Sequence, residues 1–181
     1  MLHLDKYILD KKLLSIRDTY IIRDQQKNEV GKAVKKLFSI RHKYILSDST
    51  DRELIVIQKK ILSMRPTFQF FDLQGHIIAT MKKKVFKFFG TEYWFEDADG
   101  NEILRAKGKF HAHTYQFYQT QDELVAGVSK KWIAVRDSYG IEMFSPYVDR
   151  LLILSAVIGI DAIKNEEEYE EKSSSDSDFS K

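Results

Sequence analysis

The chain has 181 residues, with 29 Lys or Arg against 27 Asp or Glu, so its formal net charge is only +2. This length suits a single domain, and the balanced total by itself points to no class of partner. The absence of cysteine excludes disulfides and thiolate zinc sites, and it is compatible with a reducing cytosol. Residues 1–6 contain neither the apolar core of a signal peptide nor a myristoylation glycine, so we expect a cytoplasmic protein.

A ten-residue phrase recurs along the chain. It reads Lys-Lys, two hydrophobic residues, Ser, one hydrophobic residue and Arg, and it closes on an aromatic residue; copies begin at Lys11, Lys35 and Lys59, and a variant begins at Lys130. Two degenerate copies fill the gap, so that closing aromatics recur every 22 to 25 residues, at Tyr20, Tyr44, Phe68, Tyr93, Tyr115 and Tyr139. A fixed period of this kind indicates one supersecondary unit used six times.

Each unit has the pattern of a β-hairpin. Apolar residues alternate with polar ones after each closing aromatic, as in Tyr44 and Leu46, and this period of two is typical of a strand with one buried face. A longer stretch rich in Ile, Val and Leu precedes the aromatic and predicts a second strand. Asp, Asn, Ser and Gly gather between units, where a hairpin needs turn residues. Six hairpins predict a mainly β chain of twelve antiparallel strands.

A single helix is predicted near the C-terminus, over about residues 146–165. Ser145 is the expected N-cap, with Pro146 at the first helical position and Asp149 in the first turn. Residues 151–160 are apolar on every side, which is typical of a helix buried all round. Only ten uncharged residues separate Arg150 from Asp161, and a membrane-spanning helix needs about 20. We therefore predict a closed twelve-stranded antiparallel barrel around a central C-terminal helix.

The two ends of the barrel are expected to carry opposite net charges. If sequential strands are neighbours, the Asp-rich turns gather at one end, where twelve acidic residues face only Lys27 and Arg52, a net charge of −10. The Lys-Lys phrases gather at the other end, which we call the basic end. The domain is expected to cover residues 1–165, and residues 166–181 form an acidic, Ser-rich tail that we expect to be disordered and to fold back over the basic end.

The phrases at the basic end supply the candidate site. Lysines and arginines gathered there can hold anionic headgroups or phosphates through charge-assisted hydrogen bonds. The candidate anion-binding residues are Lys11, Arg17, Lys35, Arg41, Lys59, Arg65, Lys130 and Arg136. The alternative interpretation is a solvated barrel face that only prevents aggregation. Adjacent lysines point to opposite faces of a strand. The second lysine of each pair is expected to have the structural role, because it shares a face with apolar residues that follow; these are Lys12, Lys36, Lys60 and Lys131.

Asp161 is the one acid on the apolar part of the predicted helix. An unpaired buried carboxylate is costly, so Asp161 should pair with an inward lysine or arginine and lock the helix in the barrel. A switch or proton-linked role is the alternative.

Catalytic and metal motifs are weak or absent in the sequence. His111 and His113 place two imidazoles on one predicted strand face, but no third ligand stands at a telling spacing, so no metal site is predicted. The sequence contains no nucleophile elbow, no phosphate-binding glycine loop and no dinucleotide fingerprint. With the barrel lumen filled by the helix, we expect a protein that is not an enzyme and needs no cofactor.

Several phrases resemble the LURP-one-related family, which belongs with the tubby C-terminal-like proteins and the phospholipid scramblases. They are the paired lysines before the Ser-x-Arg turn, the run Ser129-Lys130-Lys131-Trp132, the run from Arg136 to Gly140, and Ile160-Asp161-Ala162. The resemblance covers about residues 1–165 and implies the twelve-stranded tubby-like barrel. For relatives it also implies phosphoinositide binding or the handling of membrane lipids. The chain lacks the cysteine cluster and the proline-rich arm of scramblase-like proteins, and no lipid-contacting residue of tubby can be placed on it.

The function expected from the sequence is recognition of an anionic surface by the basic end. The surface would be the headgroups of a membrane, which the protein would meet peripherally, or an acidic partner protein. A protein-interaction or scaffold module without lipid binding is the alternative, and nucleic-acid binding is third, because no recognition helix or stacking platform is evident.

Deletion of residues 166–181 is expected to strengthen binding to anionic vesicles, since it removes seven acidic residues that screen the basic end. Vesicle sedimentation at low salt measures the effect. Equal affinities of the truncated and full chains would contradict the screening role of the tail.

Overall fold

The computed structural model describes residues 3–12, 18–36, 39, 42–86, 90–119, 122–129 and 138–178. Twelve strands, one short 3-10 helix and one α-helix make up this part of the chain. The elements are β1 Lys6–Lys12, β2 Thr19–Arg23, β3 Glu29–Lys35, β4 Lys43–Asp48, β5 Glu53–Lys59, β6 Thr67–Phe71, β7 Ile77–Phe86, β8 Gly90–Glu96, β9 Glu102–Lys109, η1 Phe110–Ala112, β10 Thr114–Tyr118, β11 Leu124–Ser129, β12 Ser138–Met143 and α1 Arg150–Asp178.

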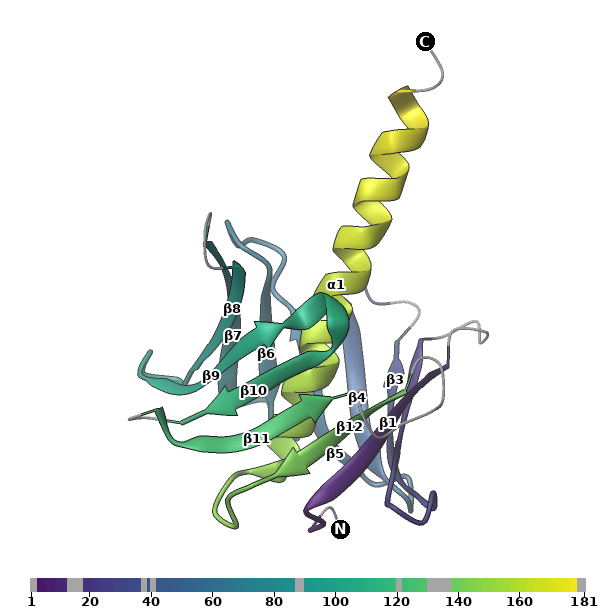
Figure 1. Ribbon diagram of the computed structural model, residues 1–181, viewed down its shortest axis with the longest axis vertical. Coiled ribbons are helices and arrows are strands. Elements are labelled where there is room, and N and C mark those ends of the chain that lie inside the picture. The colour runs from purple at the N-terminus through teal and green to yellow at the C-terminus, as the bar shows by residue number, and fades with distance from the viewer. Residues whose placement is uncertain are drawn as a thin grey trace.

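The strands form one closed antiparallel barrel in which each strand pairs with its neighbours in sequence (Figure 1). Strand β1 closes the ring by pairing with β12, in a register that sets Tyr7 opposite Ile141 and Leu9 opposite Tyr139. The predicted fold class, twelve antiparallel strands closed around a C-terminal helix, is confirmed. Closure leaves no sheet edge open for pairing with another chain.

Alternation along the strands places one residue set inside the barrel. In β4 the side chains of Tyr44, Leu46 and Asp48 are buried while those between them are half-buried. All six closing aromatics point inward and are at most 2% exposed. They therefore line the lumen at one level of each hairpin, as the period of two requires.

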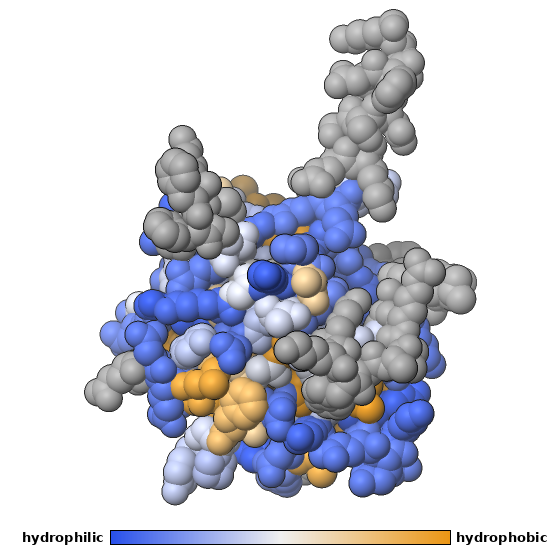
Figure 2. Space-filling view, in the orientation of Figure 1, coloured by the Kyte–Doolittle hydropathy of each residue, from blue (hydrophilic) through white to orange (hydrophobic). Residues whose placement is uncertain are grey.

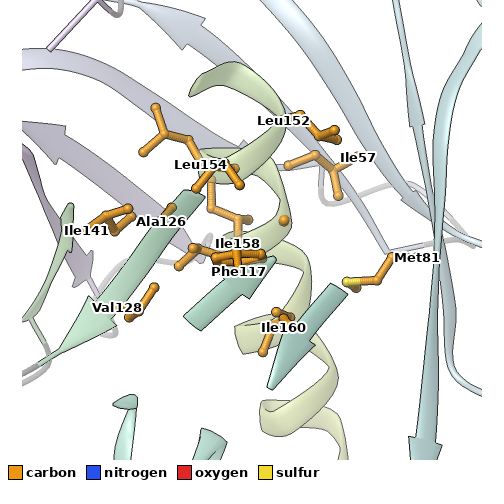
Figure 3. Packing of buried hydrophobic residues seen from close by; sticks show 14 of the residues in the cluster. Ile57, Met81, Phe117, Ala126, Val128, Ile141, Leu152, Leu154, Ile158 and Ile160 are labelled. Carbon is orange, nitrogen blue, oxygen red and sulfur yellow. The ribbon is translucent and has the colours of Figure 1, made fainter. Parts of the chain in front are cut away.

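The helix fills the barrel with apolar side chains on all of its faces. Every residue from Leu152 to Ile163 is buried, including the polar Ser155 and Asp161. Figure 3 shows Leu154 and Ile158 close to Phe117 and Ala126, which belong to strands β10 and β11. A helix without a polar face is stable in water only when it is enclosed, and the twelve strands enclose it.

The helix begins later than the sequence predicts. Asp149, and not Ser145, is the N-cap: its Oδ1 accepts a hydrogen bond from the Leu152 backbone N–H at 3.1 Å. Ser145 is buried, and its hydroxyl accepts a bond from the Tyr147 N–H at 3.4 Å. The chain leaves β12 in the barrel wall and must reach the barrel axis before a helix can start, so residues 146–149 form a turn.

The helix also ends later than predicted. It continues through residue 165 to Asp178, so residues 166–178 are helical where disorder was expected. This acidic part projects from the barrel instead of folding back over its end (Figure 1). Its first turn is attached to the wall, because Glu166 pairs with Lys59 and Glu167 pairs with Lys83.

Gly108 allows β9 to meet β10 at close range, and we expect Gly108→Ala to lower the free energy of unfolding by about 3 kcal/mol. Its φ is +145°, and an added Cβ would lie 2.6 Å from the Thr114 carbonyl oxygen and 2.6 Å from the Tyr115 Cα. Gly75→Ala is the matched control, because its φ is +89° but no atom lies within 4 Å of the added Cβ. The control should cost only about 1 kcal/mol in urea unfolding. Equal losses for the two variants would contradict the close approach.

Candidate functional site

The acidic end of the barrel is built from one repeated turn. The side chains of Asp24, Asp48, Asp72 and Asp97 each accept a hydrogen bond from the backbone N–H four residues later, at 2.8 to 3.1 Å. The residue before that N–H has a positive φ in every copy, as at Lys27 with 69° and Gly75 with 89°. Hydrogen bonds, first of all from Thr50, lower the pKa of Asp48 to about 2. The recurring aspartates are therefore explained by turn geometry.

At the basic end, the orientation predicted for the paired lysines is wrong. The second lysines Lys12, Lys36 and Lys60 are exposed, whereas the first lysines are turned toward the lumen; Lys130 and Lys131 lie outside the described residues. In β1 the inward set is Tyr7, Leu9 and Lys11, and the strand ends at Lys12. The strand residues before each lysine pair determine which lysine points inward. The apolar residues after the pair lie beyond the end of the strand and do not continue its alternation.

Each inward first lysine pairs with a carboxylate. Lys11 Nζ lies 3.0 Å from Asp161 Oδ2, Lys35 Nζ lies 2.9 Å from Asp18 Oδ2, and Lys59 pairs with Glu166. Three of the eight candidate anion-binding residues are thus held in ion pairs within the chain. Arg65 is exposed. The other four candidates, Arg17, Arg41, Lys130 and Arg136, lie outside the residues that the structure describes.

Asp161 is the centre of a buried polar cluster in the lumen. It is 4% exposed, and its Oδ2 accepts hydrogen bonds from the Tyr20 hydroxyl at 2.8 Å and the Asn165 amide at 3.0 Å, besides its ion pair with Lys11. The His113 Nδ1 lies 4.0 Å from its other oxygen. The expected basic partner is therefore Lys11, from the first strand of the barrel. A bond between the first strand and the last helix fixes the helix along the barrel axis.

A set of tyrosines surrounds this carboxylate. Five of the six closing aromatics are tyrosines, and each is at most 2% exposed; they are Tyr20, Tyr44, Tyr93, Tyr115 and Tyr139. Burial, and after it the negative charge of Asp161, raises the pKa of Tyr20, Tyr115 and Tyr139 well above the ordinary value. Their hydroxyls therefore stay neutral. Reasoning from the sequence treated these residues only as core aromatics, although tyrosine in place of phenylalanine at five of six positions is the signal that was available.

The partners of Asp161 favour its ionised form. Burial by itself would raise the pKa of this carboxyl, but the nearby Lys11 ammonium, with hydrogen bonds from Lys11 and Tyr20, holds the pKa below its usual value. The net direction is downward, so Asp161 is ionised at neutral pH and Lys11 balances it. The ion pair therefore places two opposite charges side by side in the lumen.

The two histidines do not form a pair. His111 lies exposed in the short helix η1, while His113 follows it with a φ of 47° and stacks on Tyr139 at a ring distance of 4.7 Å. The prediction that both lie on one strand face is wrong, because the chain turns here between β9 and β10. Within the described ranges, no three His, Asp or Glu side chains are grouped so that they could hold a metal ion.

The turn between β5 and β6 presents apolar side chains to solvent at the basic end. Ile61, Leu62 and Met64 are 51%, 90% and 105% exposed, and they stand between the exposed cations Lys60 and Arg65. The Ser63 hydroxyl donates to the Arg65 carbonyl at 2.6 Å and thereby closes the turn. Leu62 and Met64 follow Lys60 with the period of two and would share its face in a longer strand, but β5 ends at Lys59 and the alternation ends with it. Elsewhere, hydrophilic residues cover most of the face seen in Figure 2.

None of the helices that the structure describes has a stretch both long and apolar enough to span a bilayer.

The model of the LURP-one-related family matches residues 5–161. The chain matches no curated protein in sequence. A solved structure of a protein from Arabidopsis thaliana is similar in fold, with a TM-score of 0.64 over 88% of this chain and 91% of that chain, at 17% identity. At that identity the likeness shows the fold alone.

Asp161→Ala is expected to lower the free energy of unfolding by about 3 kcal/mol, because Lys11 would remain buried without its counter-charge. Asp99→Ala, which removes an exposed aspartate from a turn, is the matched control and should change it by less than about 0.5 kcal/mol. Urea unfolding at neutral pH measures both variants. Equal stability of Asp161→Ala and the parent chain would contradict the buried ion pair.

The stabilisation by Asp161 is also expected to depend on pH. Because the folded pKa lies below the unfolded value of 3.8, the contribution is complete above about pH 4 and is lost as pH falls through the folded pKa. The stability difference between the parent chain and Asp161→Asn should therefore be constant from pH 5 to pH 7, roughly, and shrink below about pH 4. A difference that grows on acidification would contradict this sign.

Proposed function

This chain belongs to the LURP-one-related family, and from that premise we propose that it is a non-enzymatic module whose basic end binds anionic membrane headgroups. The observation that carries the proposal is the exposed turn between β5 and β6. Three apolar side chains stand in water there, flanked by Lys60 and Arg65.

The composition of this turn favours a bilayer over other anionic surfaces. Exposed side chains such as Leu62 and Met64 gain from entering the boundary between headgroups and acyl chains. Cations beside them are attracted by anionic lipids, at about 1 kcal/mol for each Lys or Arg near the surface. An acidic partner protein would use the cations but would give less reason for apolar residues at the tip.

Neighbouring hairpins add cations at the same end of the barrel. The sequence phrase of paired lysines followed by apolar residues also joins β1 to β2 and β3 to β4; β1 and β3 end at the basic end, and β2 and β4 begin there. Lys12 and Lys36 are exposed at those strand ends. Exposed cations at several strand ends on one rim would together supply more binding energy than those of a single turn.

The projecting helix opposes this binding. Residues 166–178 leave the barrel at the basic end (Figure 1), and seven of them are acidic. An anionic surface therefore meets negative charge before it meets the lysines. This arrangement supports the expectation that the tail weakens membrane binding, although it acts from a helix and not from a folded-back coil.

A scaffold module without lipid binding is the second candidate. The length of helix outside the barrel supports it, because a helix that projects into solvent offers a surface to a partner protein.

Binding of the full chain to phosphatidylserine vesicles is expected at low salt and should weaken as salt rises, while phosphatidylcholine vesicles should bind weakly throughout. Lys60→Gln with Arg65→Gln should weaken binding about 10- to 30-fold, since two cations are lost. Leu62→Gln with Met64→Gln should weaken it about tenfold at constant charge. Vesicle sedimentation measures all three proteins.

The matched controls lie at the opposite end of the barrel. Leu73→Gln removes an apolar side chain that is 52% exposed there, and Lys27→Gln removes an exposed cation. Both should bind as the parent chain does. Absence of binding to phosphatidylserine at low salt, by the full chain and by the chain truncated before residue 166, would favour the scaffold function instead.

A further inference from the structure

A depression opens at the basic end between the helix and strands β3, β4 and β5. Its volume is about 470 Å³, within the range of small-ligand pockets. Three side chains that can carry positive charge line it, namely Lys35, His42 and Lys59. Tyr44 and Asn165 add polar groups to the lining, and the carboxylate of Asp18, which pairs with Lys35, also lines it.

The carboxylate of Glu166 already occupies this depression. It lies against both the His42 Nδ1 and the Lys59 Nζ, and its side chain is only 15% exposed. Burial by itself would raise the pKa of Glu166, but hydrogen bonds from His42 and Lys59 lower it below the usual value. The cluster therefore holds a bound anion, and that anion is part of the chain.

This anion is the carboxylate of a single side chain at the rim, beyond the buried part of the helix. Glu166 lies one turn beyond the buried residues Ala162 and Ile163, so its side chain can turn out to solvent while the helix stays in place. Lys35 is engaged by Asp18 at 2.9 Å and is 28% exposed. With Glu166 turned away, the side chains of Lys59 and His42, which are 32% and 40% exposed, would lack their acceptor and would be open to another anion.

We infer that this depression is a binding site for a phosphoryl group and that Glu166 occupies it in cis when no ligand is bound. The Lys59 ammonium can form charge-assisted hydrogen bonds with phosphate oxygens, and the His42 ring can add an N–H donor. A phosphomonoester carries about −1.5 to −2 charge and three acceptor oxygens, against one charge and two oxygens on a carboxylate. The volume leaves room for the rest of a small headgroup. The inference deepens the proposed function, on which it rests for the lipid source of the phosphate; a soluble phosphate is the other source of the same group.

Glu166→Gln in the full chain tests the site. The substitution removes the competing charge, so inorganic phosphate should bind about tenfold more tightly than it does to the parent chain, as measured by calorimetry. Glu168→Gln is the matched control, because it makes the same charge change at an exposed position two residues away. Adding Lys59→Gln to Glu166→Gln should abolish the gain. Near-ultraviolet circular dichroism shows whether each variant keeps the folded tyrosine core.

The vesicle arm separates the two sources of phosphate. Tighter binding of Glu166→Gln to phosphatidic acid vesicles and to inorganic phosphate supports a phosphoryl site reached by lipids. Tighter binding to phosphate without any binding to vesicles supports the site with a soluble ligand and overturns only the membrane function. Equal phosphate affinities for Glu166→Gln and Glu168→Gln, with both variants folded, would overturn the site, even if vesicles still bind through the exposed turn.

Discussion

Enclosure of an apolar helix is the constraint on which the rest of this structure depends. The segment from Leu152 to Ile163 has no polar face to give to water, so every side of it needs a wall. A twelve-stranded barrel without such a filling would leave a lumen too wide for side chains alone. Helix and barrel therefore stabilise each other: the helix supplies the core of the barrel, and the barrel replaces the solvent that the helix cannot tolerate.

One charged contact gives this apolar assembly its position. A helix that is apolar on all sides can rotate or slide in a smooth tube at little cost, whereas Asp161 fits only where Lys11 and Tyr20 meet it. The tyrosines at the same level keep their protons, so they add polar surface without adding charge. Because Lys11 comes from the first strand and Asp161 from the last helix, the two ends of the fold are joined at this point.

The two ends of the barrel differ in what their charges do. At one end, aspartate side chains accept hydrogen bonds from backbone N–H groups of their own tight turns, and this role accounts for their repetition. At the other end the charges are divided between cations held by carboxylates, such as Lys35 and Lys59, and cations left in solvent beside apolar side chains, such as Lys60 and Arg65. Only the second kind is available to a partner as the chain stands. The first kind becomes available when a carboxylate such as Glu166 moves, so the rim offers both a surface and a pocket.

The sequence by itself determined the repeat, the strand count, the enclosed helix and the need for a partner of Asp161, because local period, turn residues and the cost of a buried charge act wherever the segment lies. It did not determine which lysine of each pair turns inward, since that depends on where β1, β3 and β5 end, and the apolar residues beyond them misled the assignment. The sequence also left the extent of the helix undetermined, because Glu166 and Glu167 pair with lysines that lie 107 and 84 residues earlier in the chain. The exposed Leu62 and the depression around Glu166 exist only in the tertiary structure, where separate hairpins and the helix end come together at one rim.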